Sequence, residues 1–363
     1  MMEKIISAFI LLVIVILSCS TEDKENNISQ NNDPIGVVKR NNRILGFDIS
    51  TAESDNYNKT FIEVNELGAD VIDLHFNWNM LETTRGNYSI FTDKFSYIDT
   101  YYGDTGVELT IGVIDTNEIF VPDYITNTSD FESMIEPFKD LLEMLEKNLP
   151  NMKIDVLSIG NEIDIYLGDN EDAWNSWITF YKEVSLYAKK LFPDTVIGTK
   201  ATVYGALQYK EKIKQLSAHS GTSGIFLTYY PLNSDFTVKS PDIVSVEFKS
   251  IIENFYEEDS NKIYILECGY PSSSACNSSK EKQAEFVTEV FKVWDKYYNE
   301  IPMIIFAWHS ELNQDSLEVY EDKYKINSPE FFGYLGSLGF YDIEGNKKDA
   351  WEKINFELDK RAW

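Results

Sequence analysis

The sequence predicts an α/β protein that folds as a single (β/α)8, or TIM, barrel. Two observations support this fold class. Eight short apolar runs rich in β-forming residues alternate with longer amphipathic stretches from residue 44 onward, and neither a long linker nor a GxGxxG phosphate loop interrupts the chain. Eight β/α units in about 320 residues is the count that such a barrel requires. A doubly wound open sheet is the structural alternative, but it does not need eight well-spaced units.

Strands are expected where β-branched and aromatic residues gather in apolar runs, and helices where apolar residues recur every three or four positions. The expected strands are Ile44–Ser50, Val71–Phe76, Val107–Ile114, Ile154–Gly160, Thr195–Lys200, Ile225–Tyr230, Ile263–Glu267 and Met303–His309. The expected helices cover residues 54–67, 92–102, 130–148, 171–191, 207–218, 242–258, 280–298 and 347–360. The carboxyl ends of the strands, and the loops that follow them, are where a barrel of this kind carries its chemistry.

The first residues have the pattern of a targeting segment. Lys4 precedes an apolar stretch, residues 5–17, that is too short for a comfortable membrane span. The stretch ends at Ile16-Leu17-Ser18-Cys19, which resembles a bacterial lipoprotein cleavage box and implies that residues 1–18 are removed and Cys19 is lipidated. An ordinary secretory signal and a short uncleaved anchor are the alternatives.

Residues 19–42 are polar and without periodicity, so we expect a disordered tether that joins Cys19 to a catalytic barrel of residues 43–363. The acidic pair Glu22-Asp23 is similar to surface-export signals of Bacteroidetes-like lipoproteins. We therefore expect an outer-membrane lipoprotein that faces the periplasm or the cell surface. Its only contact with the membrane would be the lipid on Cys19, and we expect a monomer.

Composition excludes several classes of function. A formal net charge of −28 argues against nucleic acid as a partner, because phosphates require a basic surface. The three histidines (His75, His219 and His309) lack metal-ligand spacing, and no GxSxG elbow is present, so no metal and no cofactor are predicted. Cys268 and Cys276 either form a disulfide or remain two separate buried thiols.

Two apolar runs each deliver one glutamate at their carboxyl end. Leu157–Glu162 ends the fourth expected strand and Tyr264–Glu267 ends the seventh. A pair of carboxyl groups placed in this way is what a glycosidase needs, with one to protonate the leaving sugar and one to attack the anomeric carbon. We predict Glu162 as the acid/base and Glu267 as the nucleophile.

Each glutamate has a competing interpretation. Glu118 lies beyond the third strand and is the rival for the acid/base. The competing interpretation of Glu162 is an acid that caps the start of the next helix. Glu267 would be purely structural if it formed an ion pair at the barrel rim, for which Lys200 is the obvious partner.

Amides, acids and aromatic rings gather at the other strand ends and predict a sugar-binding surface, since flat rings stack on sugar faces while polar groups bind hydroxyls. Asn161 is predicted to bind the sugar 2-hydroxyl, and Trp308 to form the floor of the subsite where cleavage occurs. Tyr229 or Tyr230 is predicted to donate a hydrogen bond to Glu267. The full predicted binding set is Asp48, His75, Trp78, Asn161, Tyr229, Tyr230 and Trp308.

At these residues the chain resembles the glycoside hydrolases of clan A, with an Asn-Glu acid/base at the fourth strand and a nucleophilic glutamate at the seventh. The resemblance covers residues 44–363. Four fragments are similar to endo-β-1,4-galactanases, namely Gly46–Ser50, Gly160–Ile163, Thr228–Pro231 and Glu267–Pro271. The arginine that many clan relatives carry near the end of the second strand is missing from residues 71–78, and the eighth strand differs from the galactanase pattern.

The resemblance implies a retaining β-glycoside hydrolase that acts within a β-linked polysaccharide by double displacement. Galactan is one candidate substrate, and β-glucan and mannan are equally open. The alternative from a different class is a non-catalytic glycan-binding lipoprotein on a glycosidase-like barrel, which would keep the aromatic platform without needing both glutamates.

Overall fold

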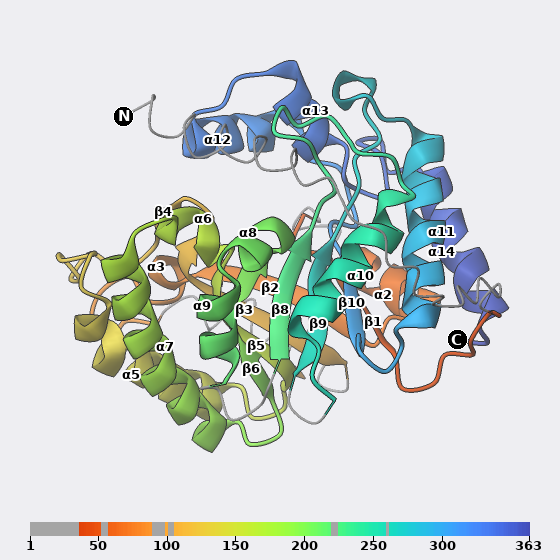
Figure 1. The fold of residues 1–363 in the computed structure, drawn as a ribbon. Helices are drawn as coiled ribbons and strands as arrows, with labels where there is room; N and C mark the ends of the chain where they lie inside the picture. The colour runs from red at the N-terminus through yellow and green to blue at the C-terminus, as the bar shows by residue number, and fades with distance from the viewer. Residues whose placement is uncertain (1–35, 52–56, 89–98, 101–104, 219–223, 259–260) are drawn as a thin grey trace, which may run out of the picture.

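The computed structural model describes residues 36–51, 57–88, 99–100, 105–218, 224–258 and 261–363 (Figure 1). The strands are β1 (Ile44–Asp48), β2 (Val71–Asn77), β3 (Gly106–Asp115), β4 (Glu118–Ile119), β5 (Lys153–Asn161), β6 (Val196–Gly198), β7 (Lys200–Thr202), β8 (Gly224–Tyr229), β9 (Lys262–Cys268) and β10 (Met303–Phe306). The α-helices are α2 (Tyr57–Leu67), α3 (Trp78–Leu81), α5 (Ile135–Asn148), α6 (Ile163–Leu167), α7 (Glu171–Leu191), α8 (Val203–Gln208), α9 (Lys210–Ser217), α10 (Ile243–Phe255), α11 (Lys280–Lys296), α12 (Gln314–Tyr324), α13 (Pro329–Gly336) and α14 (Asp349–Lys360). Two short 3-10 helices cover Phe131–Met134 and Ser274–Cys276.

Nine of the strands form a parallel sheet in the order β6-β5-β3-β2-β1-β10-β9-β8-β7. Its two ends meet in one run of chain, because β6 pairs with β5, β7 pairs with β8, and only Thr199 separates β6 from β7. The sheet therefore curls into a barrel with eight strand positions, and the prediction of a single (β/α)8 barrel is confirmed. Its helices cover the outside, with α5 beside α7 and α11 beside α14 (Figure 1).

The expected strands and helices match the observed ones closely, with differences of a few residues at their ends. The expected helix at residues 92–102 falls outside the described residues except for 99–100. Two helices, α12 and α13, occupy the stretch between β10 and α14, for which the sequence indicated no helix. Of the described helices, none combines the length and the apolar character needed to cross a membrane.

The alternation of side chains along the strands divides the barrel into an outer and an inner layer. Outward-facing residues such as Leu109, Ile159 and Leu227 join the main hydrophobic core beneath the helices. A separate apolar cluster of Val71, Val156, Phe226, Leu266, Met303 and Ile305 fills the lower part of the barrel interior. Two positions further along β2, from Val71 to Asp73, the interior becomes polar, and the charged groups therefore lie toward the carboxyl ends of the strands.

The amino-terminal boundary of the barrel is held by contacts with α11 and with the end of α14. The backbone N–H of Arg40 donates to the carbonyl of Arg361, and the buried guanidinium of Arg43 forms an ion pair of 2.8 Å with Asp295. The predicted signal peptide, Cys19 and most of the tether lie outside the described residues. Cys268 and Cys276 are separate buried thiols, which is the second of the two arrangements left open by the sequence.

Candidate active site

Glu162 stands immediately after β5 on a sharply turned backbone. Its φ of 46° is in the left-handed region, and Gly160, two residues earlier, has a φ of 88°. Gly160 is required for a second reason, because a Cβ there would lie 2.9 Å from the Trp177 ring. The turn ends the strand at once and aims the Glu162 carboxyl across the barrel mouth, and a non-glycine residue in this conformation is a common sign of a functional site.

The carboxyl of Glu162 accepts hydrogen bonds from two threonines. The Thr228 hydroxyl donates to Oε1 over 2.7 Å and the Thr116 hydroxyl donates to Oε2 over 3.1 Å. Burial, reinforced by the negative charge of Glu267, raises the pKa of Glu162 to about 8 in spite of these two hydrogen bonds. Glu162 is therefore protonated at neutral pH, as a general acid must be.

Glu267 reaches the barrel interior through an irregularity in β9. Leu227 and Thr228 are adjacent on β8, yet they pair with Ile265 and Glu267 on β9, so β9 carries one extra residue at Leu266. Such a bulge changes the direction of the side chains that follow it. As a result, Leu266 and Glu267 both point into the barrel interior. The carboxyl of Glu267 accepts a hydrogen bond of 3.0 Å from the Tyr230 hydroxyl at Oε2 and lies 3.3 Å from the Lys200 ammonium at Oε1.

The two glutamates face each other across β8. Thr228 is the register partner of Glu267 on the neighbouring strand, and the same residue donates its hydroxyl to Glu162. The negative charge of Glu267 contributes to the raised pKa of Glu162. The structure thus brings together the two carboxyl groups that the sequence had placed on separate strands, and it gives them opposite surroundings.

Beside Glu162, Asp115 orients Asn161. The Asn161 amide donates to Asp115 Oδ1 over 3.1 Å, and the ammonium of Lys323 lies 2.5 Å from Asp115 Oδ2. Burial alone would raise the pKa of Asp115, but the charges of His75 and Lys323 and these hydrogen bonds lower it to about 2. Because the ionised Asp115 holds the side-chain NH2 group of Asn161, the side-chain oxygen Oδ1 of Asn161 is left facing the site.

The buried polar atoms that have no hydrogen-bond partner within the described part of the chain include three at this end of the barrel: Asn161 Oδ1, His75 Nε2 and Asn77 Oδ1. Gly112 makes room for two of them, since a Cβ on it would lie 2.3 Å from Asn77 Oδ1 and 3.3 Å from His75 Nε2. Buried polar groups are normally hydrogen-bonded. A polar ligand such as a sugar would supply the missing partners.

Three residues at strand ends hold the left-handed backbone conformation without being glycine: Thr116 after β3, Glu162 after β5 and Trp308 after β10, with φ values of 58°, 46° and 60°. Each such residue costs roughly 1–3 kcal/mol. That all three lie around the barrel mouth agrees with a site where the fold accepts strain in order to place side chains.

The predicted binding residues divide into those at the mouth and those elsewhere. At the mouth, the Tyr230 hydroxyl donates to Glu267, and the Trp308 ring lies 5.9 Å from that of Tyr320. Asp48 is buried beside Asp73, and burial together with the charge of Asp73 raises the pKa of Asp48 to about 7. His75 faces Asp115.

Two predicted binding residues are turned away from the mouth, and these are corrections. Tyr229 faces outward from β8, because side chains alternate along a strand and Thr228 faces inward; it packs on Phe248 and Phe286, and its hydroxyl donates to Glu247. Trp78 is fully buried at the start of α3, where its indole N–H donates to Glu82. The rival acid Glu118 is exposed on the β3–β4 hairpin.

Sequence reasoning missed the aromatic cover of the site. Tyr320 and Tyr324 on α12 and Tyr334 on α13 lie near the carboxyls of Glu162 and Glu267. Burial together with the charges of these two glutamates raises the pKa of Tyr334. The spacing of Tyr320 and Tyr324, four residues apart, would have placed both rings on one face of a helix. Thr116 and Thr228, which hold Glu162, carry no recognisable signal in the sequence.

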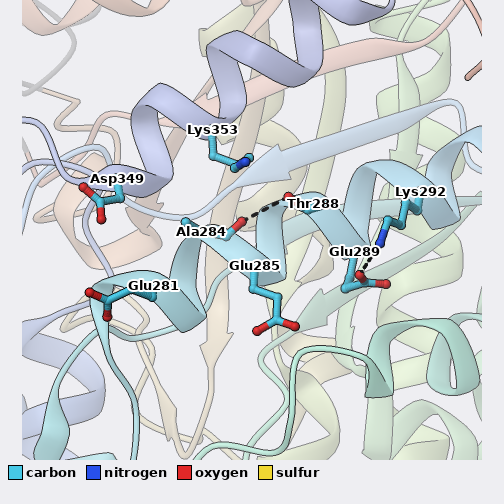
Figure 2. Close-up of a pocket in the computed structure, with 8 residues that line it drawn as sticks. All are labelled: Glu281, Ala284, Glu285, Thr288, Glu289, Lys292, Asp349 and Lys353. Atoms are coloured by element: carbon cyan, nitrogen blue, oxygen red, sulfur yellow. Dashed lines mark hydrogen bonds and ion pairs between the residues drawn. The ribbon is translucent and has the colours of Figure 1, made fainter.

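A hollow of about 490 Å³ lies on the outside of the barrel, between α11 and α14 (Figure 2). Two contacts in its lining lie within α11: Glu289 pairs with Lys292, and the Thr288 hydroxyl donates to the Ala284 carbonyl. None of the catalytic candidates lines it. Within the described residues, no group of three His, Cys, Asp or Glu side chains is arranged to hold a metal ion.

Comparison with known proteins identifies the fold. No protein-family model and no curated protein sequence matches the chain. Among solved structures, a family 5 subfamily 18 glycoside hydrolase of Bifidobacterium longum in complex with Manβ1-4GlcNAc matches with a TM-score of 0.67 at 11% identity, over 88% of this chain and 78% of that one. The chain has the barrel fold of the glycoside hydrolases.

Two further solved structures match over 88% of this chain. They are an exo-β-1,4-mannosidase of an Opitutaceae bacterium (TM-score 0.64, 13% identity) and a family 39 glycoside hydrolase of Bacteroides cellulosilyticus (TM-score 0.59, 12% identity). The chain spans 60% and 64% of the length of these two proteins, respectively. At such low identity the similarity establishes the fold, and the activity has to be argued from the site itself.

Proposed function

We propose that the protein is a retaining β-glycoside hydrolase with Glu162 as acid/base and Glu267 as nucleophile. The observation that carries the proposal is the contrast between the two carboxyl groups. Glu162 is buried against hydroxyl groups and its pKa is raised to about 8, whereas Glu267 faces an ammonium and a tyrosine hydroxyl that both favour a carboxylate. A buried carboxyl with a raised pKa opposite one that is paired with a cation is the arrangement expected of an acid and a nucleophile.

In the first step, the Glu267 carboxylate attacks the anomeric carbon of the bound sugar. The bond from that carbon to the glycosidic oxygen breaks, and the proton of Glu162 moves to the leaving oxygen. The products are a glycosyl ester on Glu267, a free alcohol on the leaving sugar and an ionised Glu162.

In the second step, the Glu162 carboxylate takes a proton from a water molecule, whose oxygen attacks the same anomeric carbon. The ester bond breaks and Glu267 returns as a carboxylate, while Glu162 regains its proton. Two inversions at one carbon leave the β configuration unchanged. We propose this outcome in place of single-step inversion because Thr228 donates to the Glu162 carboxyl and is also the register partner of Glu267, which favours a short separation of the two carboxyls.

Asn161 and the aromatic residues would hold the sugar. The free carbonyl oxygen of Asn161 is positioned to accept from the 2-hydroxyl, a contact that strengthens as positive charge develops on the ring. Trp308, Tyr320 and Tyr334 offer rings for stacking. His75 and Asp48 lie on the strands between Trp308 and Asp115 and would bind further hydroxyls of the same sugar.

The substrate we propose is a β-linked glycan, with mannan, glucan and galactan as candidates. β-Mannosides take first place, because one structural neighbour is an exo-β-1,4-mannosidase and another was solved with Manβ1-4GlcNAc. The sequence predicts cleavage within the chain. The contacts of α12 favour cleavage at a chain end instead. Lys323 pairs with Asp115 and the Tyr324 hydroxyl donates to Thr116, so that α12 crosses over the ends of β1 and β2.

The competing function is glycan capture without cleavage by a surface lipoprotein. It explains the aromatic rings and the unpartnered polar atoms, but it gives no reason for a protonated glutamate opposite an ion-paired one. In either case we propose attachment to the outer membrane through a lipid on Cys19, which mass determination of the protein extracted from membranes would test.

The pH dependence of kcat/KM should show an alkaline limb with a midpoint near pH 8. Glu162 acts as an acid, so activity is present while its proton is bound and is lost as the pH rises through the raised pKa of about 8. The measurement is kcat/KM between pH 4 and 10 on a β-glycoside with a poor leaving group. A profile that stays flat to pH 10 would contradict the role of Glu162.

The proposal as a whole is tested by incubating residues 20–363 with β-mannan, β-glucan, galactan and xylan and with manno-oligosaccharides, and counting new reducing ends. Cleavage of one glycan supports the hydrolase, and binding without cleavage supports the capture protein. Product sizes over time separate the two modes of attack: single sugars or disaccharides from the start indicate the chain end, and a ladder of long fragments indicates internal cleavage.

A further inference from the structure

Glu267 belongs to a buried group of four carboxyls and one ammonium in the barrel interior. Asp48, Asp73, Glu108 and Glu267 come from β1, β2, β3 and β9, and Lys200 comes from β7. The side chain of Lys200 is 0% exposed, and its Nζ lies 3.3 Å from Glu267, 3.4 Å from Glu108 and 3.9 Å from Asp73. A fully buried lysine is rare in proteins and is retained only where carboxylates compensate it.

Resting on the proposed function, we infer that Lys200 is the positioning residue of the nucleophile: it keeps Glu267 ionised and holds Oε1, so that the carboxylate is ready to attack at acidic and neutral pH. Among the described residues, Lys200 is the only lysine or arginine in ion-pair contact with Glu267, Glu108 or Asp73. Tyr230 holds the other oxygen, Oε2. The two contacts together fix the plane of the carboxylate.

Charge within the cluster favours this arrangement. Burial alone would lower the pKa of Lys200, but the carboxylates of Asp73, Glu108 and Glu267 raise it above its usual value, so the ammonium remains charged. Burial and the charge of Glu108 raise the pKa of Asp73 well above the usual range even with Lys200 nearby. The ammonium of Lys200 lies closest to Glu267 and Glu108, and the Thr110 hydroxyl donates to Glu108 over 2.9 Å.

Several titratable groups from the surrounding elements act on Glu267, and the carboxyls among them oppose its ionisation. The groups are Asp48 on β1, Asp73 on β2, Glu162 after β5, Lys200 on β7, Tyr230 after β8, Tyr320 on α12 and Tyr334 on α13. Three of them are carboxyls, and Lys200 is the one cation in the set. Without it, an ionised Glu267 would face like charges in a water-poor interior, which favours the protonated form.

The test compares Lys200→Met with the wild-type enzyme on 2,4-dinitrophenyl β-glycosides, whose leaving group needs no protonation by Glu162. We expect kcat/KM at pH 6 to fall about 10²- to 10³-fold, and the midpoint of the acid limb to move up by about 1–3 pH units. The double variant Lys200→Met/Glu108→Gln removes the carboxylate left unpaired. It should recover the thermal stability lost in the single variant while its acid limb stays displaced.

Lys348→Met is the matched control, since Lys348 is an equally buried lysine that pairs with Glu311 over 2.6 Å and contacts neither catalytic glutamate. It should lower thermal stability without moving the acid limb. If the acid limb of the folded double variant coincides with that of the wild type, Lys200 is a structural ion pair and the inference is wrong. If the wild type cleaves no glycoside while the protein is folded, the proposed function fails, and the inference fails with it.

Discussion

Replacing Glu267 with glutamine should abolish hydrolysis of every substrate, including glycosides with activated leaving groups. The amide cannot attack the anomeric carbon, and neither the Lys200 ammonium nor the Tyr230 hydroxyl at 3.0 Å can take over that role. Loss of a nucleophile typically costs roughly 10⁴- to 10⁶-fold in kcat. The measurement is the rate of dinitrophenol release by Glu267→Gln under conditions where the wild type is saturated.

The fold should tolerate this change, because glutamine has the same shape and Lys200 keeps its contacts with Glu108 and Asp73. Thermal unfolding and glycan binding therefore serve as controls and should remain close to wild type. Glu118→Gln is the matched comparison, since it alters an exposed glutamate on the neighbouring hairpin and should leave hydrolysis unchanged. Normal dinitrophenol release by Glu267→Gln would remove this residue from the mechanism.

Replacing Glu162 with glutamine should produce a different defect, one that depends on the leaving group. Glycans and simple alkyl glycosides should lose about 10²- to 10⁴-fold in kcat/KM, because their leaving oxygen needs the proton. Dinitrophenyl glycosides should still form the glycosyl ester at close to the wild-type rate. Their turnover should then stall, because no base remains to activate water.

Azide separates this role from a general loss of activity. As an anion it needs no deprotonation, so it should restore turnover of Glu162→Gln on dinitrophenyl glycosides and yield a β-glycosyl azide, with no effect on Glu118→Gln. The alkaline limb near pH 8 should disappear in the same variant. Cleavage that survives in Glu162→Gln but is lost in Glu118→Gln would mean that the acid is Glu118.

The barrel and both glutamates were predictable from the sequence because they depend on local patterns. An apolar run of strand length that ends in a carboxylate is visible without any knowledge of packing, as at Ile159-Gly160-Asn161-Glu162. Eight such units leave few topologies to consider, since connections between parallel strands are short and right-handed.

Side-chain direction was less predictable. Tyr229 and Tyr230 are adjacent, and only the register of β8 decides that Tyr229 packs under the helices while Tyr230 reaches Glu267. On β9, strict alternation from Leu266 would have turned Glu267 outward, and the bulge there is seen only in the pairing with β8 and β10. One inserted residue reverses the assignment of faces, which no pattern in a single strand reveals.

The cover formed by α12 and α13 also depends on contacts between distant parts of the chain. Lys323 and Asp115 are 208 positions apart, and nothing near either residue indicates the partner. Lys200 is a similar case. The sequence identified it as the partner that would make Glu267 merely structural, and the structure confirms the contact but places it on a carboxylate that also faces Tyr230 and Glu162.

The central claim is that Glu267 becomes covalently bound to the sugar, and trapping that ester tests it most directly. The wild-type protein would be incubated with 2,4-dinitrophenyl 2-deoxy-2-fluoro-β-glycosides of mannose, glucose and galactose, and then examined by intact mass and peptide mapping. The account predicts an increase in mass of one fluoroglycosyl group on the peptide that contains Glu267, and none in Glu267→Gln. A label on any other residue, or hydrolysis by the wild type that releases the α-anomer without any label, would contradict it.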